Sequence, residues 1–218
     1  MKKLVSIMVA LLFVCSVTFA QASSSITISD LSHSMVKADN LEDAAAVGLF
    51  VEPLNEFSSR FEMEEYQELI KFSEKELEKL MAAEKVTDYF GNVIVASTGE
   101  TRALLDLFDG NQPAIYEFAP IIAGGYDVSY GHVTATLLFA TPYNPGDEVA
   151  VLIGVIEYGE NEDDDSTITW YAIKGTCVSV PEYDGAEGIE VRLTPEMMMT
   201  VQDVDTLVAI ASMPFDFE

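Results

Sequence analysis

The stretch from residue 133 to residue 157 constrains this chain most, because it joins two strand-length apolar patterns through a proline–glycine turn. Apolar residues alternate with threonines over 133–139, as in a strand with one buried face. The segment 142–147 reads PYNPGD, which is typical of a tight loop. Residues 149–156 are apolar on both faces, so a second layer must cover this strand as well. We therefore predict a β-hairpin over 133–157, with the amphipathic helical segment 54–81 as its second cover.

The second half of the chain is rich in short strand patterns. Alternating segments begin at residue 115 and recur to the end, and a strand that starts at Ile115 is expected to stop at Pro120. Thr194 is the expected N-cap, and Pro195 the expected first residue, of a helical turn that runs to Gln202. A final strand is expected over 207–213. About seven short strands, with turns every 8 to 12 residues or so, indicate an immunoglobulin-like β-sandwich, and a small barrel is the alternative.

The first half is predicted to be helical. Apolar side chains recur at three- and four-residue steps over 53–90, which places one apolar stripe on a helix. Ser73 and Glu76 have capping-box spacing and favour a break near Phe72, although one continuous helix fits the stripe equally well. Shorter helices are expected over 41–47 and 101–108, with a short strand over 93–96.

These patterns predict an α+β protein with an N-terminal helical region packed on or beside a C-terminal immunoglobulin-like β-sandwich. The expected divisions are a signal peptide over 1–22, a linker or arm over 23–40, the helical region over 41–112 and the sandwich over 113–218. We expect the two halves to form one continuous unit rather than two independent domains.

The N-terminus has the layout of a secretory signal peptide. Lys2 and Lys3 precede an apolar run over 4–19, and Ala20 and Ala22 follow as small residues at a cleavage-like site. The alternative is a membrane anchor, for which the apolar run is slightly short. We predict cleavage and an extracellular location, with no attachment to a membrane afterwards.

Cleavage would leave one cysteine, Cys177, because Cys15 lies within the predicted signal peptide. A single thiol cannot form an internal disulfide. We interpret Cys177 as a small buried residue of a strand, and the alternative is a thiol that pairs with a partner protein.

The charge balance excludes one class of partner. The chain has 37 acidic and 11 basic residues and a formal net charge of −26. A nucleic-acid-binding protein needs clustered lysine and arginine to displace the counterions of phosphates, so no nucleic-acid partner is expected. Divalent cations are compatible with this charge.

Several short motifs resemble a group of bacterial proteins. The motifs are YEF at 116–118, GY at 125–126, SYG at 129–131, FATPY at 139–143, ITW at 168–170 and LTPE at 193–196. Together they resemble uncharacterised secreted proteins of anaerobic Gram-positive gut bacteria, over roughly residues 50–213. The resemblance implies the secreted compartment and the C-terminal sandwich, and it assigns no functional residues.

No pattern of residues predicts a reaction. The chain has two histidines, His33 and His132, and it lacks the HExxH, GxSxG, Walker and GxGxxG motifs. Ser129 lies three residues before His132, but this spacing alone supplies neither an orienting carboxylate nor an oxyanion site. A glycosidase would use two of the 37 acids, and the sequence favours no particular pair. No catalytic and no cofactor-binding residues are therefore predicted.

The acidic segment 160–165 gives the one candidate metal site. Asp163, Asp164 and Asp165 offer the oxygen ligands that calcium prefers. The segment lacks the alternating DxDxDG spacing, so a solvated acidic loop is the alternative interpretation. The sequence suggests no cofactor other than calcium.

Tyrosines are the candidates for ligand contact. Trp170 is in phase with Ile168 and Ala172 and is predicted to pack between sheets, although stacking on a sugar is the alternative. The side chain of Tyr171 is expected on the opposite face, and with three other tyrosines it forms the predicted contact set. The members of this set are Tyr126, Tyr130, Tyr143 and Tyr171.

Three consecutive methionines, Met197, Met198 and Met199, are expected to place one or two side chains in the end of the core, and an adaptable contact surface is the alternative. These features together predict a secreted, non-enzymatic protein that binds or structurally engages an extracellular protein or glycan. The alternatives are a carbohydrate- or calcium-binding module and, third, a glycoside hydrolase or other hydrolase.

Overall fold

The strands in the described part of the chain form one ten-stranded sheet at the centre of the molecule. The computed structural model describes residues 35–139, 143–159, 166–180 and 187–211. The strands are β1 (Val36–Ala38), β2 (Phe50–Pro53), β3 (Asn92–Val95), β4 (Thr101–Ala103), β5 (Ile115–Gly124), β6 (Val133–Phe139), β7 (Glu148–Glu157), β8 (Thr167–Ser179), β9 (Glu187–Leu193) and β10 (Thr206–Ala211). Helical segments connect them: η1 (Ala45–Val47), η2 (Glu64–Tyr66), α2 (Gln67–Ala82), α3 (Val86–Phe90), α4 (Leu104–Leu107), η3 (Val128–Tyr130) and α5 (Pro195–Val201).

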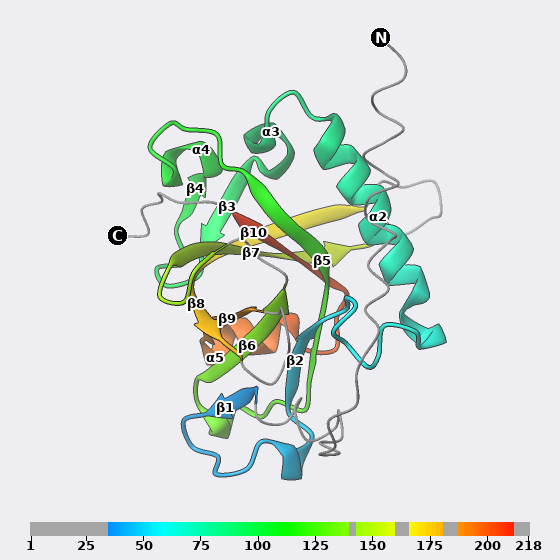
Figure 1. Ribbon diagram of the computed structural model, residues 1–218, viewed down its shortest axis with the longest axis vertical. Coiled ribbons are helices and arrows are strands. Elements are labelled where there is room, and N and C mark those ends of the chain that lie inside the picture. The colour runs from blue at the N-terminus through cyan, green and yellow to red at the C-terminus, as the bar shows by residue number, and fades with distance from the viewer. Residues whose placement is uncertain (1–34, 140–142, 160–165, 181–186, 212–218) are drawn as a thin grey trace, which may run out of the picture.

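The sheet curls into a nearly closed antiparallel barrel (Figure 1). Its strand order is β1-β6-β9-β8-β7-β10-β5-β2, and β3 and β4 branch from β8. The two ends of this order meet at β6, where Thr136 N donates to Met35 O (2.8 Å) beside β1. Asn55, just after β2, donates from Nδ2 to Leu138 O of β6 (2.8 Å). Closure of this kind pairs most of the strand edges with a neighbouring strand.

The predicted fold class is therefore wrong. The chain is mainly β-structure, and its helices cover a barrel-like sheet instead of forming a separate region beside an immunoglobulin-like sandwich. Strands β1 to β4 all lie before residue 113, in the part predicted to be an arm and a helical region, and they join the same sheet as the later strands. The small barrel weighed as the alternative is nearer to the structure.

The predicted hairpin over 133–157 is also wrong. Both of its strands form at the expected places, as β6 and β7, but they do not pair with each other. Strand β6 pairs with β1 and β9, whereas β7 pairs with β8 and β10. Alternation fixes which face of a strand is buried, but it carries no information about which strand lies next to it.

The inner face of the barrel holds an aliphatic core. It includes Val149, Val151 and Ile153 of β7, and α5 adds Met197 and Met198 from one end. Thr194 caps α5 as predicted, since its Oγ1 accepts from Met197 N (3.1 Å).

The prediction that one or two of the consecutive methionines enter the core is confirmed. Met197 and Met198 are buried, whereas Met199 is exposed on the opposite side of α5. Cys177 is buried in the same inner core, as interpreted from the sequence.

A second core lies on the outer face of the same sheet. Here α2, α3, α4 and β3 pack over Ala150, Leu152 and Ile156 of β7, and Trp170 is buried among them. Figure 1 shows the three helices gathered along the top and right of the barrel. The helical cover expected for the second apolar face of β7 is thus present. The ring of Trp170 packs beneath this helical layer and not between two sheets.

Helix α2 is continuous through Ser73, so the alternative without a break there is correct. Ser73 and Glu76 are buried in mid-helix, where Glu76 accepts from Tyr89 Oη (3.1 Å) and Lys79 Nζ (2.6 Å). The helix begins later than expected, since β2 and a connecting loop occupy the first part of 53–90. None of the helices in the described part of the chain combines the length and hydropathy that a bilayer span requires.

Strand β5 continues through Pro120, where a stop was predicted. Pro120 O accepts from Leu54 N (2.8 Å), so the side of Pro120 that lacks an N–H faces β2. Strand β2 ends at Pro53. The N–H that Pro120 lacks would therefore point past the end of β2, where no strand residue needs it as a donor. The pairing of β5 with β10 on its other side needs no donor from Pro120.

Candidate cleft beside strand β5

The predicted tyrosine set does not form one site. Tyr126 and Tyr130 do meet, with ring centroids 6.1 Å apart. Tyr126 is buried, however, and its hydroxyl donates to Gly131 O (2.8 Å). Tyr126 therefore stabilises its own loop and is not accessible to a ligand.

The other two tyrosines lie elsewhere. The ring of Tyr143 packs edge-on against Tyr116 at 5.2 Å, and burial raises the pKa of Tyr143. Tyr171 is half-buried on β8, on the opposite face from Trp170 as expected, and it lines a hollow of about 220 Å³ between β3 and α5. The set thus separates into three places on the molecule.

The other sequence candidates give no site either. Asp163, Asp164 and Asp165 lie outside the described residues, so calcium binding there stays a prediction. Within the described ranges, no group of three or more histidine, cysteine or acidic side chains is arranged to hold a metal ion. Ser129 donates to Asp127 and not to His132.

A cleft opens where β2 and β5 part. Strand β2 has four residues and β5 has ten, so β2 covers only the second half of the β5 edge. After Leu54 the chain turns away, and Asn55 fixes the turn by donating to Leu138 O of β6 and accepting from Phe57 N (3.0 Å). The chain then passes to α2. The space left between this loop, α2 and β5 has a volume of about 280 Å³.

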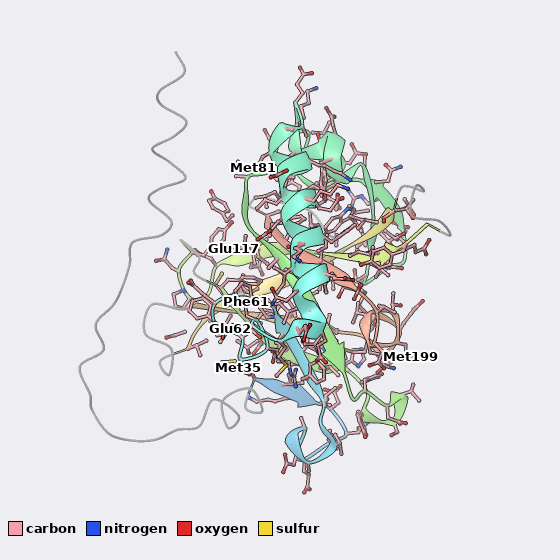
Figure 2. The ribbon with its side chains drawn as sticks, turned by 90° about the vertical axis from the view of Figure 1, so that its right-hand side faces the viewer. Met35, Phe61, Glu62, Met81, Glu117 and Met199 are labelled. Carbon is pink, nitrogen blue, oxygen red and sulfur yellow. The ribbon has the colours of Figure 1, made fainter. Side chains whose placement is uncertain are left out.

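The walls of the cleft combine apolar side chains and carboxylates. The loop supplies Leu54, Glu56, Phe57 and Phe61, α2 supplies Ile70, Ser73 and Glu74, and β5 supplies Glu117, Phe118, Ala119 and Pro120. Figure 2 shows Glu117 beside the middle of α2, with Phe61 nearer the start of the helix and Met81 at its far end. No lysine, arginine or histidine is among the described residues of this lining.

Glu117 is the unusual group of this cleft. Burial, as the larger cause, and the negative charge of Glu56 together raise the pKa of Glu117 to about 7. Both causes penalise the ionised carboxylate, and no cation among the described lining residues offsets them. A strongly perturbed acid in a cleft is a recognised mark of a functional site.

A neighbouring glutamate shows what a structural carboxylate looks like in this fold. Glu52 of β2 accepts from Ser58 Oγ (2.7 Å), and Arg60 Nη1 lies 3.5 Å from its other oxygen. Arg60 in turn lies 4.0 Å above the ring of Phe50. The charge of Glu52 is therefore paired with Arg60 of the loop that follows β2, whereas Glu117 faces a cleft lined by further carboxylates.

A second hollow lies between β3, β8 and α5, in two adjoining parts of about 210 and 220 Å³. Its basic side chains are already paired. Lys174 contacts Glu148, and Arg192 Nη2 donates to Asp39 Oδ2 (2.7 Å). This hollow therefore presents less unsatisfied charge than the cleft beside β5.

Comparison with protein-family models, with curated proteins and with solved structures gives no significant match to this chain.

The sequence carries a signal for Glu117, which is not among the predicted site residues. Within the predicted strand at 115–119, Glu117 is in phase with Ile115 and Ala119, so the strand pattern alone places a charged residue between two apolar ones. The abundance of acids concealed it, because one glutamate among 37 acidic residues does not stand out. Its neighbour Glu56 is 61 positions away in the chain and comes close only through the fold.

Proposed function

We propose that this protein is an extracellular, non-enzymatic binding protein whose cleft beside β5 accepts a ligand with a cationic group and an apolar body. The extracellular location rests on the signal-peptide pattern of residues 1–22. The observation that carries the proposal is Glu117, a half-buried carboxylate with a pKa raised to about 7 in a cleft that also exposes Glu56 and Glu74.

The physical reason is the cost of keeping Glu117 ionised. Burial and the charge of Glu56 both disfavour its carboxylate, and a cation placed beside it would relieve both effects. The aromatic rings of Phe57 and Phe61 and the side chain of Ile70 give the ligand an apolar surface to contact. A small organic ammonium ion fits both requirements better than a bare metal ion, which would leave the apolar walls unused.

The test is calorimetric titration with benzylammonium as the probe and benzyl alcohol as its neutral counterpart. We expect benzylammonium to bind. Glu117→Gln should weaken its affinity by about tenfold or more, because a hydrogen bond to a charged carboxylate is replaced by one to a neutral amide. Affinity should fall by about tenfold for each unit of pH below about 7, as Glu117 takes up a proton.

The matched control is Glu190→Gln, which removes one exposed carboxylate from β9 outside the cleft. This variant should bind benzylammonium as the wild type does. Equal binding by the wild type and by Glu117→Gln, or equal binding of the alcohol and the ammonium ion, would overturn the proposal.

One observation favours a hydrolase as the second candidate. An acid with a pKa near 7 and a second carboxylate in one cleft resemble the acid and base or nucleophile of a glycosidase. A panel of aryl glycosides tests this candidate directly. Turnover that is lost in both Glu117→Gln and Glu56→Gln would replace the binding proposal with catalysis.

A further inference from the structure

We infer that the open edge of β5 binds an extended basic peptide as an added strand, with a lysine or arginine side chain of the peptide in the cleft against Glu117. This inference rests on the proposed function, since it uses the same cleft. It goes further by naming the class of partner and the way in which its backbone is held.

The first step is that no strand in the described part of the chain pairs with the first half of this edge. Strand β5 pairs with β10 along one edge over 115–121. On the other edge β2 pairs only with residues 121–124, and the last bond of that side is Leu54 N to Pro120 O (2.8 Å). Within the described part of the chain, no strand pairs with this edge over 115–119.

The second step is the direction of the backbone groups. Pro120 O faces the β2 side, and residues two apart along a strand direct their N–H and C=O groups to the same side. The N–H and C=O of Phe118 therefore face the space that β2 has left. An added strand could exchange hydrogen bonds with Phe118 there, as peptides do when they extend a sheet.

The third step is that the departing chain leaves room beside this edge. Asn55 directs the loop toward β6 by donating to Leu138 O. The loop then returns to α2 and forms the far wall of the cleft with Phe57 and Phe61. The register between β5 and β10 shifts between Ile210 and Ala211, whose partners are Glu117 and Ile115, and irregularities of this kind are common beside functional sites.

The fourth step is selection by charge. An open strand edge would pair indiscriminately unless something opposed it, and a charged side chain beside the edge is a common protection. Here Glu56, Glu74 and Glu117 repel acidic strands, including a second copy of this chain with its net charge of −26. A basic peptide is attracted by the same charges. The carboxylates that protect the edge from other strands therefore also select a basic partner.

The experiment varies the peptide and leaves the protein unchanged. The parent is a capped peptide of about six residues, the usual length of a strand, with one lysine among alternating valine and threonine. One variant carries N-methyl groups on alternate backbone amides, and another replaces lysine by norleucine. Binding is measured by fluorescence anisotropy, and exchange of the Phe118 amide hydrogen is followed by NMR.

We expect the parent peptide to bind and to slow exchange of the Phe118 amide by about tenfold or more. Methylation of the amides that face β5 and replacement of lysine by norleucine should each weaken binding by about tenfold or more. Glu117→Gln should abolish the preference for lysine over norleucine, whereas Glu190→Gln should keep it.

The outcomes separate the two proposals. If benzylammonium binds but backbone methylation changes nothing, the added strand is wrong and the cationic cleft stands. If neither probe binds, both proposals fail. Concentration-dependent self-association that protects Phe118 without any peptide would assign the edge to a second copy of the chain and overturn the inference.

Discussion

The inner and outer cores lie on opposite faces of the same strands and are built differently. The inner core is mainly aliphatic and is filled largely by the alternating residues of the barrel strands, with α5 closing one end. The outer core is rich in aromatic rings from separate segments. Trp170 of β8 lies 4.7 Å from Phe90 of α3 and 6.2 Å from Phe118 of β5 between ring centroids. The outer core therefore depends on distant parts of the chain meeting over the barrel.

The two cores nevertheless share one scaffold. Strand β7 contributes Val149, Val151 and Ile153 inward and Ala150, Leu152 and Ile156 outward. Neither core can lose these strands without exposing the other. This arrangement favours a single cooperative unfolding transition, as expected for one continuous unit.

The largest effect should come from truncating one side chain in each core. We expect Trp170→Ala in the outer core to lower the free energy of unfolding by about 3–5 kcal/mol and Met198→Ala in the inner core by about 2–5 kcal/mol. Both residues are buried, at 4% and 0% exposure. Urea denaturation followed by far-UV circular dichroism measures both values.

The same experiment tests cooperativity, because Trp170 is the only tryptophan and its fluorescence reports the outer core. In Met198→Ala the fluorescence and dichroism transitions should shift together. A fluorescence transition that stays at the wild-type midpoint while dichroism shifts would show that the two cores unfold separately.

A smaller effect is expected from filling a glycine site on each face. A methyl group on Gly154 would lie 2.7 Å from Cζ3 of Trp170, on the outer face, and one on Gly175 would lie 2.8 Å from methyl groups of Ile189 and Val151, on the inner face. Each alanine substitution should cost about 1–3 kcal/mol through overpacking. Thermal and urea denaturation of the two variants measure this cost.

A second substitution distinguishes the two glycine sites. Trp170→Phe should recover part of the stability lost in Gly154→Ala, because the smaller ring leaves room for the methyl group. It should not rescue Gly175→Ala. Equal rescue of both variants would mean that the close packing is not specific to each face.

The smallest effect on stability is expected at the unpaired edge of β5, where the side chain of Glu117 lines the cleft. Its pKa of about 7 in the folded protein exceeds the ordinary value of 4.5, so the folded state binds the proton more tightly than the unfolded state. The resulting stabilisation is complete below about pH 4.5 and is lost as the pH rises through about 7. The negative charge of Glu56, which lines the same cleft, contributes to the raised pKa of Glu117.

Glu117→Gln removes this dependence. After allowance for solvent screening of a partly exposed group, we expect the variant to be about 1–2 kcal/mol more stable than the wild type near pH 8 and similar to it near pH 4.5. Urea denaturation across this pH range measures the difference. A constant difference at every pH, or one that Glu190→Gln reproduces, would contradict the assigned cause.

Much of the local structure was predictable from the chain. Alternation located β6 and β7, the threonine–proline pair located α5, and the two apolar faces of β7 implied a covering layer that the structure contains. The stop at Pro120 was wrong because proline forbids only a donor, and here the donor falls on an edge where the partner strand has ended.

The candidate site was less predictable. The tyrosines were chosen as polar aromatic residues of strands and turns. However, the hydroxyl of Tyr126 bonds within its own loop, and the ring of Tyr143 packs against Tyr116. The cleft depends on β2 being shorter than β5 and on Asn55 turning the chain toward β6. Neither is visible in a pattern of hydrophobic residues.

The sequence by itself determined which face of the regular strands and helices is buried, because backbone geometry imposes a period of two on strands and of 3.6 on helices. Only the tertiary structure decided that β9 and β8 lie between β6 and β7, that the sheet closes into a barrel, and that Glu117 meets Glu56 in a cleft. Those outcomes depend on which distant strands pair and on where a strand ends. They are set by packing and hydrogen bonding over the whole sheet, which local periodicity does not encode.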